Sequence, residues 1–235
     1  MYNNRKIAVI IPAAGKSTRM KSNQNKQYML LQGIPVVART IEMFEKNPYI
    51  DEIVPVVNPD DVEYFKKNII EEYNFSKIKN LALGGKERQE SCRNGLMSVS
   101  QDVDYVLFHD GARPFVTTNI IDKTIMALIN EGFDACCTAV PVKDTVKVAN
   151  IEMNIMDTPD RKTLYGAQTP QGFKFKLIKG LYDRACNEDV NATDDSQIAE
   201  HYGVDSHIVI GSYDNIKITT KEDLYIAEII LKARG

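Results

Sequence analysis

Short apolar runs alternate with longer amphipathic stretches along the chain as far as Pro141. Runs of strand length predict β-strands, and stretches with apolar positions three or four residues apart predict helices. The expected strands are Ile7–Ile11, Ile53–Val57, a short one near Ile78–Leu83, Tyr105–Phe108 and Ala135–Val140, and the expected helices are Val36–Phe44, Val62–Ile70, Ser91–Val99 and Ile120–Asn130. Continuously apolar strands separated by helices predict an α/β fold, a three-layer Rossmann-like sandwich with a mainly parallel sheet.

This alternation stops after Pro141. Residues Lys143 to Thr163 are polar, rich in Asp, Lys, Asn and Pro, and too irregular for another strand and helix. A surface loop would fit, but more than about 20 structureless residues are uncommon inside a compact domain, so an arm at about 141–163 that packs on a partner fits at least as well. The core is expected to resume at Leu164, with helices Phe175–Ala185, Asp194–His201 and Glu222–Lys232 and strands Ile208–Ile210 and Ile216–Ile218. We therefore expect one domain over residues 1–235, with a protruding arm.

Composition and charge exclude several classes of protein. With 235 residues and a net charge of −3, the chain lacks the basic surface expected of a nucleic-acid binder, so an anion site must be local. No apolar run approaches the roughly 18 residues of a membrane span, and we expect a cytoplasmic protein. The four cysteines lack zinc-ligand spacing and are expected to be free thiols.

The loop directly after the first strand is the first candidate for chemistry. It reads Pro12-Ala13-Ala14-Gly15-Lys16-Ser17-Thr18-Arg19-Met20, and Lys26 follows a few residues later. Ligands of parallel α/β sheets bind outside the carboxyl ends of the strands, and small residues beside cations favour phosphate. A solvated charged loop is an equally good interpretation of this segment alone. A Walker A motif is excluded because Ile10 stands where it needs glycine, and no dinucleotide-binding glycine fingerprint follows the strand.

Two further loops follow predicted strands. Leu83 to Ser91 contains paired glycines, and its simplest interpretation is a turn with Ser91 capping the next helix. The other loop, His109-Asp110-Gly111-Ala112-Arg113-Pro114, places a carboxylate at a strand end, where it could bind Mg²⁺. Asp110 is therefore the metal candidate. Arg113 would pair with Asp110 or with a phosphate, and His109 is interpreted as a packing residue rather than a base.

The remaining polar segments indicate little one by one. Thr193 and Asp194 look like helix caps, and Lys217 on an edge strand would ordinarily point to solvent. The segments are Asp144-Thr145, Arg161, Gln168-Thr169-Pro170-Gln171, Thr193-Asp194-Asp195 and Asp214-Asn215-Ile216-Lys217-Ile218-Thr219.

Taken in order, these segments resemble the 2-C-methyl-D-erythritol 4-phosphate cytidylyltransferases, enzymes of the non-mevalonate isoprenoid pathway. The similarity runs from Ile7 to the final helix. It rests on A-A-G with Arg19-Met20, Lys26-Gln27-Tyr28, Gly84-Gly85 with Arg88 and Ser91, H-D-G-A-R-P, V-K-D-T, A-Q-T-P-Q and D-N-I-K-I-T. The resemblance implies that CTP and a sugar-alcohol phosphate give a CDP-linked product and pyrophosphate, with Mg²⁺ as cofactor.

The resemblance also implies roles for particular residues. Arg19 and Lys26 would stabilise the charge developing on the α-phosphate of CTP, and Arg161 and Lys217 would position the substrate phosphate with Thr145 nearby. The residues implied to contact CTP are Ala13, Ala14, Gly15, Gly85, Ser91, Asp110 and Gly111. In this family the arm crosses to a second subunit, so Thr145 and Arg161 are expected to complete the partner's site in a homodimer.

Two positions depart from the family pattern. Ser17 stands where glycine is common, and Asn25 stands where proline commonly precedes Lys-Gln-Tyr, which loosens the constraint on how Lys26 is presented.

Two other functions stay open. Ribitol 5-phosphate cytidylyltransferases share several motifs but usually read A-G-G in the first loop. A non-catalytic nucleotide-binding regulator would be expected to lose a cation or the metal carboxylate, and this chain retains them.

Overall fold

The computed structural model describes residues 1–15 and 25–234 of the chain. Its central element is a seven-stranded sheet with the strand order β11-β7-β10-β6-β1-β4-β5. The bounds are β1 Ile7–Pro12, β4 Glu52–Val57, β5 Ala82–Leu83, β6 Tyr105–Phe108, β7 Ala135–Pro141, β10 Tyr165–Lys174 and β11 Ser206–Ile210. Within this sheet β10 runs antiparallel to both neighbours, and the other strand pairs are parallel.

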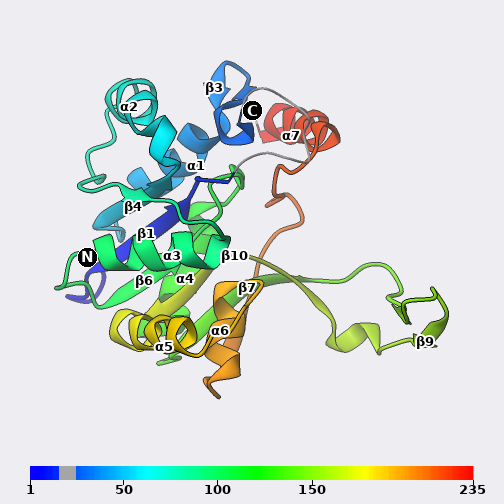
Figure 1. The fold of residues 1–235 in the computed structure, drawn as a ribbon. Coiled ribbons are helices and arrows are strands. Elements are labelled where there is room, and N and C mark those ends of the chain that lie inside the picture. The colour runs from blue at the N-terminus through cyan, green and yellow to red at the C-terminus, as the bar shows by residue number, and fades with distance from the viewer. Residues whose placement is uncertain (16–24, 235) are drawn as a thin grey trace.

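Helices cover both faces of the sheet (Figure 1). Successive side chains of a strand point to opposite faces. In β1, Ile7, Val9 and Ile11 accordingly pack in one apolar cluster, while Ala8 and Ile10 pack in another. The first cluster includes residues of α1 Val36–Glu45, α2 Val62–Phe65 and α4 Thr118–Ile129, and the second those of α3 Arg88–Ser98, α5 Phe175–Asn187 and α6 Asp195–His201. The predicted three-layer α/β architecture is confirmed.

The strand order places a topological switch point beside β1. The chain runs from β1 outward to β4 and β5, then returns to β6 on the other side of β1. The loops that follow β1 and β6 therefore leave neighbouring parallel strands at the carboxyl edge of the sheet, which is where parallel α/β sheets bind ligands.

The ten-residue strand β10 was not among the predicted elements. It lies between β6 and β7, and its register shifts between Ala167 and Gln171. The segment includes Gln168, Thr169, Pro170 and Gln171, so it lacks the apolar run that the other inner strands have. Proline within a run also argues against a central strand, and here it coincides with the irregularity.

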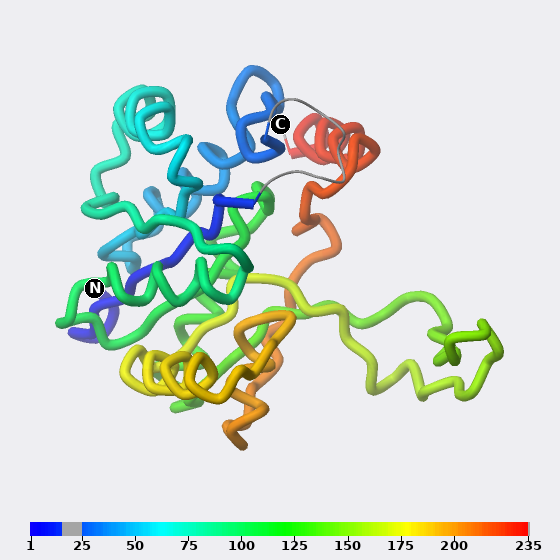
Figure 2. Tube along the Cα trace, in the orientation of Figure 1, coloured from blue at the N-terminus to red at the C-terminus, as the bar shows by residue number. Residues whose placement is uncertain are grey.

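The segment between β7 and β10 forms an arm that leaves the body of the molecule (Figures 1 and 2). The arm contains two short antiparallel strands, β8 Val148–Ala149 and β9 Ile155–Asp157, and a 3₁₀ turn, η5 Arg161–Thr163. At its base the Val142 N–H donates to the Leu164 carbonyl at 3.0 Å. Apolar side chains near its tip face outward, with Ile151 98% and Met153 82% exposed.

The C-terminal part differs from the prediction at one strand. Residues 216–218 form no strand, and the Ile218 N–H donates to the Ala112 carbonyl of the body at 2.8 Å. Ile218 is instead buried in a third apolar cluster with Leu31 and Ala227. This cluster joins helix α7 Lys221–Arg234 to the hairpin of β2 Leu30–Leu31 and β3 Ile34–Pro35 (Figure 2).

Smaller differences concern the ends of elements. Helix α3 begins at Arg88 rather than at Ser91, and the expected short strand is reduced to β5 plus an isolated bridge between Ile53 and Ile78. Among the helices of residues 1–15 and 25–234, none is long and apolar enough to cross a membrane.

Candidate active site

Loops from neighbouring strands meet at the carboxyl edge of the sheet. After β1, the Ala13 N–H donates to the Val56 carbonyl of β4 at 2.8 Å. After β6, the Gly111 N–H donates to the Pro12 carbonyl at 3.1 Å. The side chain of Thr40 in α1 also donates to the Gly111 carbonyl, at 3.1 Å. The predicted loops of Ala13 and Gly111 therefore lie side by side at the switch point.

The loop after β5 packs against the loop after β1. The Gly84 N–H donates to the Val57 carbonyl at 2.8 Å, and a Cβ on Gly84 would stand 2.2 Å from the Cβ of Ala14. The next residue, Gly85, donates its N–H to Ser91 Oγ at 3.0 Å, and that hydroxyl donates to the Glu87 carbonyl at 3.0 Å. Ser91 thus lies in the first turn of α3 and braces the glycine turn, rather than capping the helix as expected.

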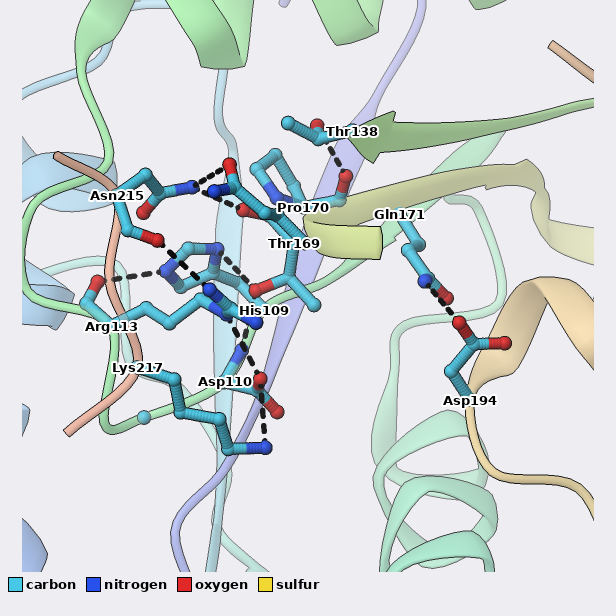
Figure 3. A network of polar contacts seen from close by, with 12 residues as sticks. His109, Asp110, Arg113, Thr138, Thr169, Pro170, Gln171, Asp194, Asn215 and Lys217 are labelled. Carbon is cyan, nitrogen blue, oxygen red and sulfur yellow. Dashed lines mark hydrogen bonds and ion pairs between the residues drawn. The ribbon is translucent and has the colours of Figure 1, made fainter. Parts of the chain in front are cut away.

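Asp110 is the centre of a group of charges at the end of β6 (Figure 3). Its Oδ2 lies 3.1 Å from Arg113 Nε and 3.0 Å from Lys217 Nζ, and its Oδ1 lies 3.8 Å from Arg88 Nε. Burial opposes ionisation of this carboxyl. The charges of Lys217, Arg88 and Arg113 outweigh burial and hold the pKa of Asp110 well below its usual range.

Lys217 reaches Asp110 because the segment before α7 is tied to the sheet (Figure 3). The buried Asn215 donates from Nδ2 to the Thr169 carbonyl of β10 at 2.9 Å, and its own carbonyl accepts from Arg113 Nη1 at 2.8 Å. The expectation that Lys217 points to solvent from an edge strand is therefore wrong, since no strand forms here and the side chain pairs with Asp110.

His109 is fully buried, and both of its ring nitrogens are hydrogen-bonded. Asp110 N–H donates to Thr169 Oγ1 at 3.1 Å, so the Thr169 hydroxyl proton is available to His109 Nδ1 at 3.1 Å. The other nitrogen, Nε2, then donates to the Arg113 carbonyl at 3.0 Å. Burial lowers the pKa of His109 to about 4, so the ring is neutral at pH 7. The interpretation of His109 as a packing residue is confirmed.

Arg88 is held by a partner that is distant in the sequence. Its guanidinium bonds both carboxylate oxygens of Asp195 at 3.1 and 2.6 Å, and Tyr182 Oη donates to the same carboxylate at 2.5 Å. Burial lowers the pKa of Arg88, but the Asp195 carboxylate outweighs it and raises the pKa overall. Arg88 belongs to one of the motifs on which the family resemblance rests, but the resemblance gives it no role. No local pattern signals its pairing with Asp195, because α6 brings the carboxylate there.

The charged side chains line a cleft of about 200 Å³ between the β6 end and α6. Arg88, Arg113 and Lys217 contribute positive charge, and Asp110 and Asp194 contribute negative charge. Asp194 caps α6 as expected, because its side chain accepts from Gln197 N–H at 2.9 Å. Cations fixed at a strand end suit an anionic ligand, and a phosphate is the natural fit.

Lys26 stands in a 3₁₀ turn, η2 Lys26–Tyr28, near the same edge. The buried Gln27 donates from Nε2 to the Ala13 carbonyl at 2.8 Å, which ties this turn to the loop after β1. Gly15 ends the first described stretch, and Arg19 lies outside the described residues.

Thr145 and Arg161 lie in the arm and are exposed. Arg161 Nη1 donates to the Lys143 carbonyl at 2.8 Å. Over the described part of a single chain, neither residue contacts the group around Asp110. The arm that carries them leaves the body of the molecule (Figure 1).

A metal ion would find few protein ligands at this site. Residues 1–15 and 25–234 contain no group of three or more His, Cys, Asp or Glu side chains that could hold a metal. Among the cations of the described residues, Arg113 and Lys217 face Asp110 Oδ2, and the more distant Arg88 is the one nearest Oδ1. Mg²⁺ is commonly bound by one or two carboxylates together with substrate phosphates and water, and Asp110 fits that type of site.

Comparison with known proteins agrees with this geometry. The family model described as 2-C-methyl-D-erythritol 4-phosphate cytidylyltransferase matches residues 7–233. The chain is 49% identical over 234 residues to the protein of that name from Alkaliphilus oremlandii, covering 100% of this chain and 98% of the relative. It is 45% identical to the protein of that name from Clostridioides difficile, covering 95% of this chain and 93% of the relative.

Solved structures with a similar fold carry equivalent names. The 4-diphosphocytidyl-2C-methyl-D-erythritol synthase of Anaerococcus prevotii superposes with a TM-score of 0.86 at 36% identity, covering 97% of this chain and 96% of that one. The 2-C-methyl-D-erythritol 4-phosphate cytidylyltransferase of Thermus thermophilus superposes with a TM-score of 0.79 at 26% identity, covering 97% and 99%. This chain belongs to the 2-C-methyl-D-erythritol 4-phosphate cytidylyltransferase family.

Proposed function

We propose that this chain is a single-domain cytidylyltransferase that transfers CMP from CTP to 2-C-methyl-D-erythritol 4-phosphate and releases pyrophosphate. The observation that carries the proposal is the cleft after β6, where Arg88, Arg113 and Lys217 surround Asp110. Cations fixed at the carboxyl edge of a parallel sheet suit two polyanionic substrates, a triphosphate and a polyol phosphate. Membership of the family supports the same reaction.

The reaction is a direct in-line displacement at the α-phosphorus of CTP. An oxygen of the polyol phosphate forms the new bond, the bond to the oxygen that bridges the α- and β-phosphates breaks, and pyrophosphate leaves with the electron pair. No general base is needed, because a phosphate monoester with a second pKa of about 6 is mostly dianionic at neutral pH. His109 is unsuited to that role, since it is buried with both ring nitrogens engaged.

The main obstacle is bringing two polyanions together, so catalysis rests on positioning and on fixed positive charge. In our proposal Arg19 and Lys26 stabilise the charge that develops on the α-phosphate. Gln27 supports this arrangement because it ties the Lys26 turn to the Ala13 carbonyl. Lys217 positions the substrate phosphate, and its position beside Asp110 at the cleft supports that role.

We assign the holding of CTP to the loops at the carboxyl edge of β1, β5 and β6. Their small residues allow backbone N–H groups to approach a nucleotide closely, and the contact of Gly84 with Ala14 supports a site built from backbone. Ser91 contributes through the Gly85 turn that it braces. The CTP-binding residues of the proposal are Ala13, Ala14, Gly15, Gly85, Ser91, Asp110 and Gly111.

Mg²⁺ is the cofactor of the proposal, held by Asp110 together with triphosphate oxygens. The ion would supply neutralisation of the negative charge on the triphosphate. Asp110 is kept ionised by its cationic neighbours, which suits a metal ligand at neutral pH.

We further propose that the active form is a cytoplasmic homodimer joined through the arm. The outward apolar side chains of the arm support an interface, since such a surface is otherwise costly to expose. Thr145 and Arg161 lie on this arm, between β7 and β10. They would position the polyol phosphate in the partner's site.

Pyrophosphate release from CTP tests the proposed function, with polyol phosphates offered in turn. We expect release with 2-C-methyl-D-erythritol 4-phosphate and far slower release with ribitol 5-phosphate. Preference for ribitol 5-phosphate would replace the proposed substrate, because the two differ in pocket contacts rather than in reaction type. CTP binding without release with either substrate would favour a non-catalytic regulator.

A further inference from the structure

The turn that carries Lys26 begins at Asn25, whose side chain makes a contact outside the turn. Asn25 Nδ2 donates to Asp61 Oδ2 at 2.9 Å. The Asn25 carbonyl accepts from the Tyr28 N–H at 3.0 Å and so closes the turn. Asn25 is therefore joined to the turn by its backbone and to a different part of the fold by its side chain.

Asp61 offers a fixed point for that contact. It ends the 3₁₀ turn η3 Pro59–Asp61, which directly follows β4. Its N–H donates to the Asn58 carbonyl at 2.9 Å, and the buried Asn58 side chain accepts from Asp60 N–H at 3.0 Å. The Asp61 carboxylate is thus attached to the inner part of the sheet by a short, hydrogen-bonded connection.

The same carboxylate also faces the far end of the Lys26 turn. Burial and the neighbouring Asp61 carboxylate raise the pKa of Tyr28. The Tyr28 ring packs edge-on against Tyr64 at 4.9 Å and against Phe65 at 6.4 Å between centroids. Asp61 therefore bonds the start of the turn through Asn25, and the end of α2 packs against Tyr28 at the other end of the turn.

The backbone of Asn25 has the conformation that a proline ring would impose. Its φ is −62° and its ψ is 131°. Proline fixes φ near −65°, whereas asparagine has no ring and samples a wider range. A hydrogen bond to a carboxylate is among the stronger ones and can restrict that freedom.

We infer that Asn25 and Asp61 are a positioning pair that holds the Lys26 turn in its productive orientation. This inference rests on the proposed role of Lys26 at the α-phosphate. The pair acts through the backbone of the turn, so its loss misplaces the Lys26 ammonium while leaving its charge intact. Misplacement of a catalytic cation lowers kcat, because the cation is most needed where transition-state charge develops.

The kcat and KM values of single variants test the Asn25–Asp61 pair. Asn25→Ala and Asp61→Ala are each expected to lower kcat about tenfold and to change KM for the polyol phosphate by less than about twofold. The double variant is expected to lose no more than either single variant, because both remove the same hydrogen bond. Asp61→Asn keeps an acceptor oxygen and is expected to retain most of kcat.

Proline provides the matched test of mechanism. Asn25→Pro is expected to keep kcat within about twofold of wild type, because its ring sets the φ that Asn25 already has. In the Asn25→Pro background, Asp61→Ala is then expected to cost little. An equal loss from Asp61→Ala in both backgrounds would overturn the inference and assign Asp61 a purely structural role.

Hydrogen exchange separates this inference from the proposed function. The Tyr28 and Met29 amides donate to the carbonyls of Asn25 and Lys26, so their exchange reports the turn without any turnover. We expect exchange about tenfold faster in Asn25→Ala and Asp61→Ala, and near wild type in Asn25→Pro. If the wild type transfers no CMP, the proposed function fails and exchange still tests the pair. If the wild type and Lys26→Ala behave as proposed but Asn25→Ala alters neither kcat nor exchange, only the pair fails.

Discussion

The Lys217 ammonium lies 3.0 Å from the Asp110 carboxylate, so a residue from the segment before α7 faces a residue at the end of β6. A substrate phosphate entering the cleft would compete with Asp110 for this ammonium. The contact therefore holds Lys217 ready at the place where we propose that the polyol phosphate binds.

Replacement of Lys217 should weaken binding of the polyol phosphate. Lys217→Met removes the charge and keeps much of the apolar stem, so KM for the polyol phosphate is expected to rise about 10- to 100-fold, as for a lost hydrogen bond to a charged group. KM for CTP should change by less than about threefold. Lys217→Arg retains the charge and should show a smaller rise. Equal increases in both KM values in steady-state kinetics would contradict the assignment.

Asp110 should make the protein more stable above about pH 4 than below it. Its folded pKa is depressed, so its contribution is present above the unfolded value of about 3.9 and is lost as pH falls below that value. Asp110→Asn removes the carboxylate that Arg113 and Lys217 contact and should cost about 3 kcal/mol at pH 7. In urea unfolding measured between pH 3 and pH 7, the free energy of unfolding should therefore fall less steeply towards acid pH in Asp110→Asn than in wild type.

The exposed Asp205 provides the control for this measurement. Asp205→Asn is expected to leave the free energy of unfolding within about 0.5 kcal/mol of wild type at pH 7. If the free energy of unfolding falls equally steeply towards acid pH in wild type and Asp110→Asn, the charges around Asp110 contribute nothing to stability.

His109 should stay neutral at a pH where an ordinary imidazole is half protonated. The folded pKa of His109, about 4, lies below the unfolded value of about 6.5. The contribution of the neutral ring to stability is therefore fully present above pH 6.5 and is lost as pH falls towards 4. In NMR spectra recorded from pH 7.5 to 5, the His109 ring resonances should not move, and they should report a proton on Nε2. Titration of His109 above pH 6 would contradict the buried, doubly bonded geometry.

Gly84 should be required for CTP binding. The Cβ in Gly84→Ala would stand 2.2 Å from the Ala14 Cβ, so the loops after β1 and β5 would have to separate. We expect KM for CTP to rise at least about tenfold while the circular dichroism spectrum is unchanged. Gly180→Ala in α5, where no atom lies within 4 Å of the new Cβ, should leave the kinetics unchanged and raise stability by roughly 0.5–1 kcal/mol. Normal CTP kinetics in Gly84→Ala would remove this loop from the site.

Mixing two impaired variants tests whether the arm completes a partner's site. Lys26→Ala should lower kcat roughly 10²–10³-fold, and Arg161→Ala should chiefly raise KM for the polyol phosphate. In a heterodimer of the two, one site would contain both intact residues, because Lys26 comes from one subunit and Arg161 from the other. At a polyol phosphate concentration well below the raised KM, each heterodimer is expected to have about half the activity of a wild-type dimer, and an equimolar co-refolded mixture about one quarter. Failure to recover activity, with heterodimers verified by mass, would argue against shared sites.

The core of the sheet was predictable from sequence because its strands are buried on both faces. Ile7 to Ile11 is apolar at every position, and the structure buries alternate side chains on opposite faces. Loops after such strands are expected to converge, so Ala13 and Asp110 could be brought together from pattern alone. The family resemblance added roles for these residues, which periodicity does not provide.

Features made by long-range contacts were harder to predict. The central strand β10 carries Pro170 and polar side chains, and it is stabilised by pairing with β6 and β7 rather than by an apolar run. Lys217 reaches Asp110 only because Asn215 bonds to Thr169 of that same strand. The pairing of Arg88 with Asp195 likewise depends on α6, which packs on α5 and brings Asp195 to the start of α3, and no local spacing reveals it.

The fate of the α-phosphorus tests the central claim most directly. CTP labelled at the α-phosphorus would be incubated with the protein, Mg²⁺ and 2-C-methyl-D-erythritol 4-phosphate, with a chelator in a parallel reaction. We predict that the label moves quantitatively into a CDP-linked polyol, with one pyrophosphate released per transfer and no labelled protein, and that the chelator stops it. Label that remains in CTP, or that appears only as free CMP, would contradict the proposed transfer.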